Sequence, residues 1–162
     1  MSGSRKLLIF GGLTLAALGM LYGLHYAVFI EHQTLDRLVG SLAQAFADAA
    51  QANRDGSNQA IAAYAATKYN YVRQVDVHSH WIGLAMLMIV LGATFDRLTF
   101  SENLKLCLAV AMLAGSIIFP LGVILQTANH GGWIPSGLAV AGSALVTISL
   151  AGVVWGFARQ QG

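Results

Sequence analysis

Four long apolar stretches constrain the fold of this chain more than any other feature. They cover about residues 7–30, 76–95, 104–126 and 136–157. Each is close to the roughly 20 residues that a helix needs to cross the hydrocarbon core of a bilayer. Only 10% of the residues are charged, against about 25% in soluble domains. We therefore predict an all-α integral membrane protein, a four-helix bundle in which residues 1–162 form a single domain.

The first stretch has the length of a retained membrane helix. A signal-peptide core is about 7–15 residues long and ends at a small-x-small cleavage site. Residues 7–30 form a longer run without a clear site of that kind, and the run continues into His25, Tyr26 and Phe29. We expect this helix to remain in the protein.

The charge and the cysteine content exclude several classes of function. The net charge of +2 is too small to indicate a nucleic-acid partner. Cys107 is the only cysteine, so the chain has neither an internal disulfide nor a Cys-x-x-Cys motif. This argues against four-helix disulfide-forming enzymes that work with quinones.

The polar segment between the first two apolar stretches predicts a helical hairpin over about residues 33–75. One helix face carries Leu35, Leu38, Leu42 and Phe46, at spacings of three and four. Residues 53–58 predict a turn, with Asn58 as the N-cap of the second arm. That arm continues the spacing with Ile61, Tyr64, Lys68, Tyr71 and Val75. We expect the apolar seams to pack as in a coiled coil, extending the first two membrane helices outward. The alternative is a loop that orders only on a partner.

The distribution of Lys and Arg predicts the orientation. With four spans, Arg5, Lys6, Arg97, Lys105 and Arg159 fall on one side of the membrane. The positive-inside rule then places both termini in the cytoplasm and the hairpin outside. We predict a multi-pass protein of the inner (cytoplasmic) membrane with a periplasmic or extracellular hairpin.

This topology brings all five histidines to the outer side. At 1.5 Å per residue, His25 lies about 27 Å above Leu7, and His78 about 25 Å above Phe95. His80 lies within a turn of that level. His32, which we interpret as a solvated residue, and His130 form a second, higher level.

Imidazoles on facing helices at matched depth are typical of a haem held by two axial histidines. We therefore predict a haem b site near the outer face, with His80 or His78 as one ligand and His25 or His130 as the other. Room for the flat macrocycle would come from Gly83, Gly92, Gly115 and Gly122.

Copper or zinc held by the same four histidines is the alternative site, since both metals favour imidazole. In a helix the rings of His78 and His80 point about 200° apart, so they would chelate one ion only if the helix end were extended. Each histidine also has a structural interpretation, such as an interfacial side chain bonded to a carbonyl.

The segment His78-Ser79-His80-Trp81-Ile82-Gly83 resembles the His-x-His-rich start of a helix in small four-helix membrane proteins akin to subunit I of haem–copper oxidases. The resemblance covers residues 78–92. It implies that His78 or His80 is a ligand of a low-spin haem. Trp81 departs from the family's leucine at that position, and the chain has no adjacent His-His pair for the oxidase's copper centre.

Three hypotheses about function follow. The first is a membrane haem b electron-transfer protein, or a subunit of a respiratory complex, that exchanges electrons with a quinone or a periplasmic redox protein. The second is a copper or zinc protein. The third is a cofactor-free structural subunit of a homo-oligomer or a larger membrane complex. Oxygen reduction by this chain alone is not expected.

Overall fold

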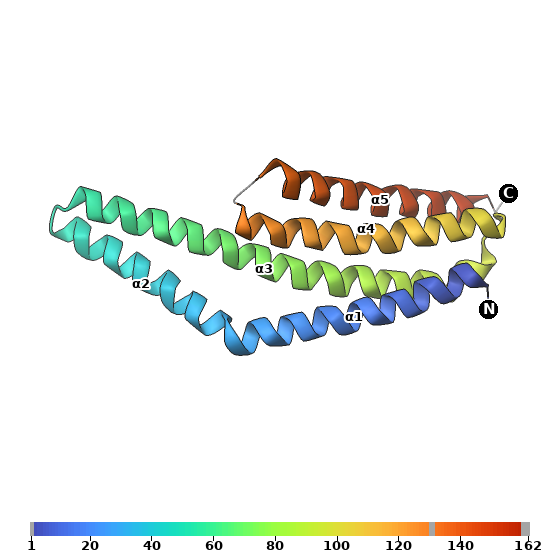
Figure 1. Ribbon diagram of the computed structural model, residues 1–162, viewed down its shortest axis with the longest axis horizontal. Coiled ribbons are helices and arrows are strands. Elements are labelled where there is room, and N and C mark those ends of the chain that lie inside the picture. Colours follow the sequence, from blue (N-terminus) through green and yellow to red (C-terminus); the bar gives the residue numbers. More distant parts are fainter. Residues whose placement is uncertain (1, 130–131, 160–162) are drawn as a thin grey trace.

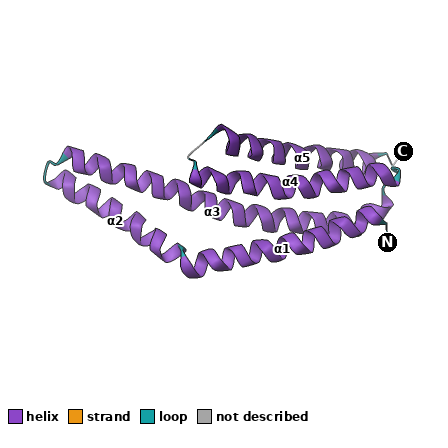
Figure 2. Ribbon diagram, viewed as in Figure 1, coloured by secondary structure: helices purple, strands orange, loops and turns teal. Residues whose placement is uncertain are grey.

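The computed structural model describes residues 2–129 and 132–159. Figures 1 and 2 show that this part of the chain is helical and contains no strand. Its elements are α1 (Gly3–Phe29), α2 (Glu31–Ala50), α3 (Arg54–Thr94), the short 3-10 helix η1 (Phe95–Arg97), α4 (Glu102–Ala128) and α5 (Trp133–Ala158). Four of them, α1, α3 with η1, α4 and α5, are long and apolar enough to cross a membrane. The all-α class is confirmed, and so is the presence of four helices with the length and apolar composition of membrane spans.

The membrane-length helices are arranged around α3 and α4. Helices α1, α3 and α4 contact one another, whereas α5 packs chiefly on α4. In Figure 1, α5, α4, α3 and α1 follow one another across the molecule. Because α1 also contacts α4, helices α1, α3 and α4 form a group of three, and α5 packs on the α4 side of this group.

Glycines set the distance between α4 and α5. A Cβ atom added at Gly115 would lie 2.7 Å from the carbonyl oxygen of Gly142, and one added at Gly122 would lie 2.4 Å from the backbone nitrogen of Ala139. Close backbone approach of this kind maximises van der Waals contact between membrane helices, which gain little from the hydrophobic effect in lipid. The space beside these two glycines thus holds the backbone of α5, so Gly115 and Gly122 do not supply the room for a macrocycle that we expected of them.

The other two glycines of that expectation have different surroundings. Gly92 packs against α1, because a Cβ there would lie 2.7 Å from Cγ1 of Ile9. A Cβ atom added at the exposed Gly83 would have no atom of another described element within 4 Å. Three of the four glycines therefore serve helix packing.

Helix α3 is continuous from the hairpin into the apolar region. Its 41 residues extend for roughly 60 Å at 1.5 Å per residue, about twice the thickness of the hydrocarbon core. Its first half pairs with α2, and its second half packs on α1 and α4 (Figure 1). The predicted hairpin between the first two apolar helices is thus present. It starts at Glu31, after Ile30 interrupts the helix between α1 and α2.

The tip of the hairpin differs from the sequence prediction. Helix α3 begins at Arg54, and its N-cap is Asn53, whose side chain accepts a hydrogen bond from the backbone N–H of Gly56 at 3.1 Å. Asn58, the N-cap that we predicted, lies inside the first turns of α3. Asn53 is the N-cap in place of Asn58, because its backbone N–H and its side-chain amide both bond to Asp48 at the end of α2. These two bonds fix the turn.

The seam between α2 and α3 is lined by small side chains. Ala45 and Ala60 are buried, at 5% and 8% exposure, whereas Val39 and Phe46 are 69% and 68% exposed. Leu35 and Leu42 are also exposed, so the predicted leucine seam is wrong in its detail. Alanines let the two helices approach closely, and the larger side chains are displaced to the exposed face of α2.

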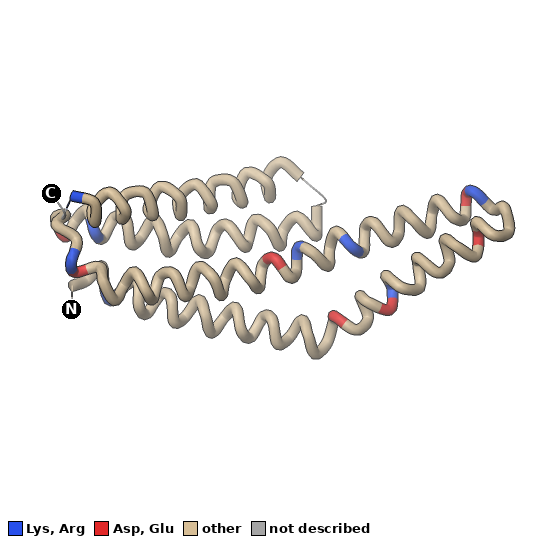
Figure 3. The backbone as a smooth tube through the Cα atoms, turned by 180° about the vertical axis from the view of Figure 1, so that it is seen from behind, with Lys and Arg blue, Asp and Glu red and all other residues tan. Residues whose placement is uncertain are grey.

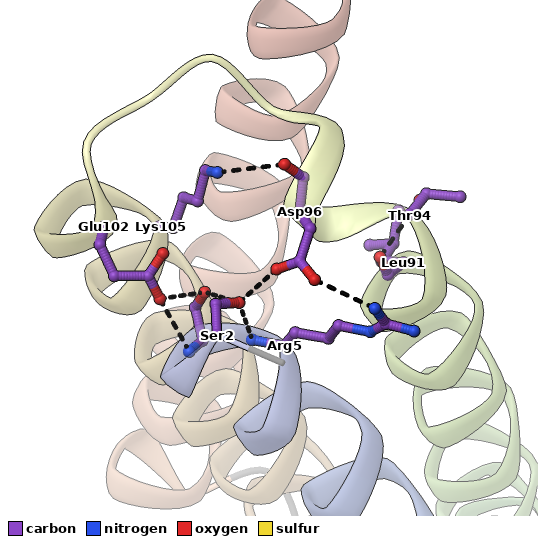
Figure 4. A network of polar contacts seen from close by, with 8 residues as sticks. Ser2, Arg5, Leu91, Thr94, Asp96, Glu102 and Lys105 are labelled. Atoms are coloured by element: carbon purple, nitrogen blue, oxygen red, sulfur yellow. Dashed lines mark hydrogen bonds and ion pairs between the residues drawn. The ribbon is translucent and has the colours of Figure 1, made fainter.

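Polar side chains tie the opposite end of the molecule together (Figure 4). Arg5 of α1 pairs with Asp96 of η1 at 3.0 Å, and Ser2 also donates to Asp96. The hydroxyl of Ser4 donates to Glu102 of α4 at 2.8 Å. These contacts join the starts of α1 and α4 to the connector after α3.

We expect Gly122→Ala to weaken the contact between α4 and α5, because the added methyl group would meet the backbone of Ala139. Overpacking of this kind costs about 1–3 kcal/mol. Gly137→Ala is the matched control, since no atom lies within 4 Å of the added Cβ. It should be neutral or stabilising by up to about 1 kcal/mol. Thermal melting of helix content in detergent compares the two, and equal melting temperatures would contradict the close approach.

We also expect Ala45→Asp to destabilise the hairpin by about 3 kcal/mol, because it buries an unpaired carboxylate between α2 and α3. Phe46→Asp is the control at the neighbouring, exposed position and should change stability by no more than about 0.5 kcal/mol. Limited proteolysis of the hairpin in detergent reports the difference. Greater sensitivity in the Phe46 variant would show that α2 is rotated from the orientation described here.

Candidate functional site

The two histidines of the His-x-His segment lie on an unbroken stretch of α3 and face different neighbours. The Nδ1 atom of His78 donates a hydrogen bond to the carbonyl oxygen of Gly19 in α1, at 2.9 Å. The ring of His78 occupies the space beside Gly23, where a Cβ atom would lie 2.3 Å from Nδ1 and from Cε1. His78 therefore forms part of the contact between α1 and α3.

His80 faces α4. Its Nδ1 atom donates to the carbonyl oxygen of Asp76, one turn earlier in α3, at 2.6 Å. Its ring meets that of Phe119 edge to face, with 4.6 Å between centroids. Because α3 is helical through both histidines, the two rings are separated around the helix as expected, and they do not chelate one ion together.

The protonation of both rings follows from these bonds. A carbonyl oxygen only accepts hydrogen bonds, so Nδ1 carries the proton in each ring, and in the neutral imidazole Nε2 keeps its lone pair. Metal-bound histidines are typically oriented in this way, with the second nitrogen held by a carbonyl or carboxylate. In the neutral form, His78 and His80 thus each have a lone pair on Nε2 that is available to a metal.

The other described histidines, His25 and His32, do not lie beside His78 or His80. His25 is exposed, and its ring lies beside that of Phe29 at 5.3 Å between centroids. The face of α1 toward α3 carries Gly19, Gly23 and Tyr26, more than a quarter-turn away from His25. His32 is exposed in α2. His130, the fourth candidate ligand, lies outside the described residues.

No group of three His, Cys, Asp or Glu side chains with metal-binding geometry occurs in residues 2–129 and 132–159. The copper or zinc site predicted from His25, His78, His80 and His130 thus stays a prediction that depends on His130.

An aromatic and amide cluster beside His78 was missed by the sequence reasoning. The hydroxyl of Tyr22 donates to Oε1 of Gln74 in α3. The ring of Tyr22 meets that of Trp81 edge to face, at 5.4 Å between centroids. The sequence contains no local signal for this cluster, because Tyr22 and Trp81 lie on different helices and meet only when α1 packs on α3.

Tyr22 and Trp81 also border an apolar groove of about 650 Å³ between α1 and α4. No histidine of the described residues lines this groove. A planar cofactor bound through His78 or His80 would therefore not sit in it.

Comparison with models of known protein families, with curated proteins and with solved structures finds no match. The resemblance of residues 78–92 to haem–copper oxidase subunit I stays a prediction.

We expect Gly23→Ala to destabilise the protein by about 1–3 kcal/mol, because the methyl group would displace the ring of His78 from the carbonyl of Gly19. Combining it with His78→Ala should cost less than the sum of the two single changes, since the clash disappears with the ring. Melting temperatures of the four proteins complete this cycle, and strictly additive shifts would contradict the contact.

Proposed function

We propose that the chain is a multi-pass protein of the inner membrane, with both termini cytoplasmic and the hairpin outside. Figure 3 supports this proposal: charged residues gather at the end that holds both termini and along the hairpin, and a long uncharged region separates the two groups. The end with the termini carries Arg5, Lys6, Arg97, Lys105 and Arg159, as the positive-inside rule requires of a cytoplasmic face.

We further propose that the protein binds a haem b near its outer face and transfers electrons there, with His80 as one axial ligand. The observation that carries this proposal is the bond from Nδ1 of His80 to the carbonyl of Asp76. It orients the ring and leaves Nε2 for iron. His78 has the same tautomer, but its ring is engaged in the contact with α1, so we prefer His80.

The described residues fit one axial position. Helix α4 packs Phe119 against His80 and ends two residues before His130. We therefore prefer His130 as the second ligand over His25, whose helix face is turned away from α3. Bound haem would supply reversible one-electron transfer, for exchange with a quinone or a periplasmic redox protein. The protein's part is to hold the imidazole of His80 in one tautomer and one orientation.

The test is the visible spectrum of the purified protein and of its single His→Ala variants. Iron held by two imidazoles is low-spin, so His80→Ala should abolish the low-spin signal, and one further substitution, His130→Ala, should do the same. His32→Ala is the control and should leave the spectrum unchanged.

Other outcomes separate the alternatives. A full low-spin spectrum in the double variant His78→Ala, His80→Ala would end the haem proposal. Stoichiometric copper or zinc without haem absorption would support the metal site. A protein with neither would be the cofactor-free subunit of a homo-oligomer or larger complex.

A further inference from the structure

A small polar cavity lies where α1, α2 and α3 meet, just beyond the outer end of α1. Its volume is about 180 Å³, and its polar lining includes Tyr26, Thr34, Arg37, Thr67, Asn70 and Gln74. At roughly 30 Å³ per water molecule, this space holds about six waters or a small ligand with some of them. None of these residues belongs to the histidine site.

Two buried polar atoms beside this cavity have no hydrogen-bond partner. Tyr26 is only 7% exposed, and its hydroxyl oxygen is unpartnered, as is Oδ1 of Asn70. The hydroxyl of Thr34 lies near Tyr26, but it donates its proton to the carbonyl of Ile30 at 3.0 Å, and the two hydroxyls do not reach hydrogen-bonding geometry. Buried polar groups are normally satisfied, so these atoms indicate a ligand or ordered water in the cavity.

Three groups at the cavity can donate hydrogen bonds into it: the hydroxyl of Tyr26, the NH₂ group of Gln74 and the guanidinium of Arg37. The Oε1 atom of Gln74 accepts from Tyr22, which leaves the NH₂ group of Gln74 to donate. The unpartnered Oδ1 atom of Asn70 is an acceptor as placed, and turning the amide by 180° presents its NH₂ group instead. Arg37 reaches the cavity from its exposed rim and forms no ion pair among the described residues. A site with spare donors and one unpaired guanidinium is complementary to an oxyanion.

The nearest negative charge is already engaged. Glu31, the first residue of α2, accepts a hydrogen bond from Tyr71 at 3.4 Å and does not line the cavity. Its charge would repel a bound anion without direct contact, so removing that charge should strengthen anion binding.

We propose that this cavity binds a phosphate group, held by the guanidinium of Arg37 and the hydroxyl of Tyr26. Arginine matches phosphate through paired N–H donors. The cavity follows the last turn of α1, at the level where phospholipid headgroups lie in the proposed topology. The phosphate therefore comes either from solution or from a lipid headgroup, and both sources use the same chemistry.

Inorganic phosphate is the probe for the first source. The full chain in a maltoside detergent free of phospholipid should show a saturable rise in melting temperature as phosphate is added. Arg37→Gln should weaken the apparent affinity at least tenfold, and Tyr26→Phe should weaken it several-fold. Arg54→Gln, at the exposed tip of the hairpin, is the charge-matched control and should bind like the unchanged protein. Glu31→Gln should bind more tightly, because it removes a negative charge near the site.

Phospholipid retention is the probe for the second source. Native mass spectrometry of protein extracted from phosphatidylglycerol vesicles counts the lipids that remain bound. Loss of a bound lipid in Arg37→Gln, but not in Arg54→Gln, assigns the site to a headgroup, whereas phosphate binding with unchanged retention assigns it to a soluble anion. If Arg37→Gln matches Arg54→Gln in both experiments, the cavity holds water only and the proposal is overturned. The haem spectrum is independent of all these outcomes.

Discussion

The close approach of α1 to α3 is the contact on which the rest of the structure depends. A Cβ atom added at Gly12 would lie 2.9 Å from the carbonyl of Ala85, and the one added at Gly23 would meet the ring of His78. These contacts fix α3 against α1 over its apolar half. Because α3 is one rigid helix, they also fix the direction in which the hairpin leaves the membrane-length region. The position of the polar cavity at the α1–α2 break follows from the same contact.

Much of this architecture is predictable from the sequence, because apolar length and helical periodicity are local signals. The four spans and the hairpin follow from the stretches around residues 7–30, 76–95, 104–126 and 136–157, and from the spacings in 31–75. The seam within the hairpin was not predictable in the same way. Two faces of α2 both carry apolar side chains. The face with Ala45 packs on α3, because its small side chain allows closer packing.

The histidine site shows a different limit of sequence reasoning. Depth along a helix is calculable from residue number, and it placed His25 level with His78 and His80. Direction around the helix depends on which face packs, and that is set by Gly19 and Gly23 on α1. Since His25 lies on another face, equal height does not bring it to His78. The sequence shows Gly19 and Gly23 four residues apart, a spacing typical of close helix packing, but it does not show that the imidazole ring of His78 packs there.

The two histidines of one short segment therefore have different consequences for the protein. His78 joins two helices through the carbonyl of Gly19 in α1, so its loss affects packing first. The Nδ1 atom of His80 bonds instead to a carbonyl of its own helix. Its ring contacts α4 through the edge of Phe119. Of the two, only His80 makes its hydrogen bond within its own helix, and its ring packs on Phe119 of α4 instead of bridging α1 and α3. A ligand that binds at this level would thus meet His80 first, while His78 maintains the α1–α3 contact beneath the hairpin.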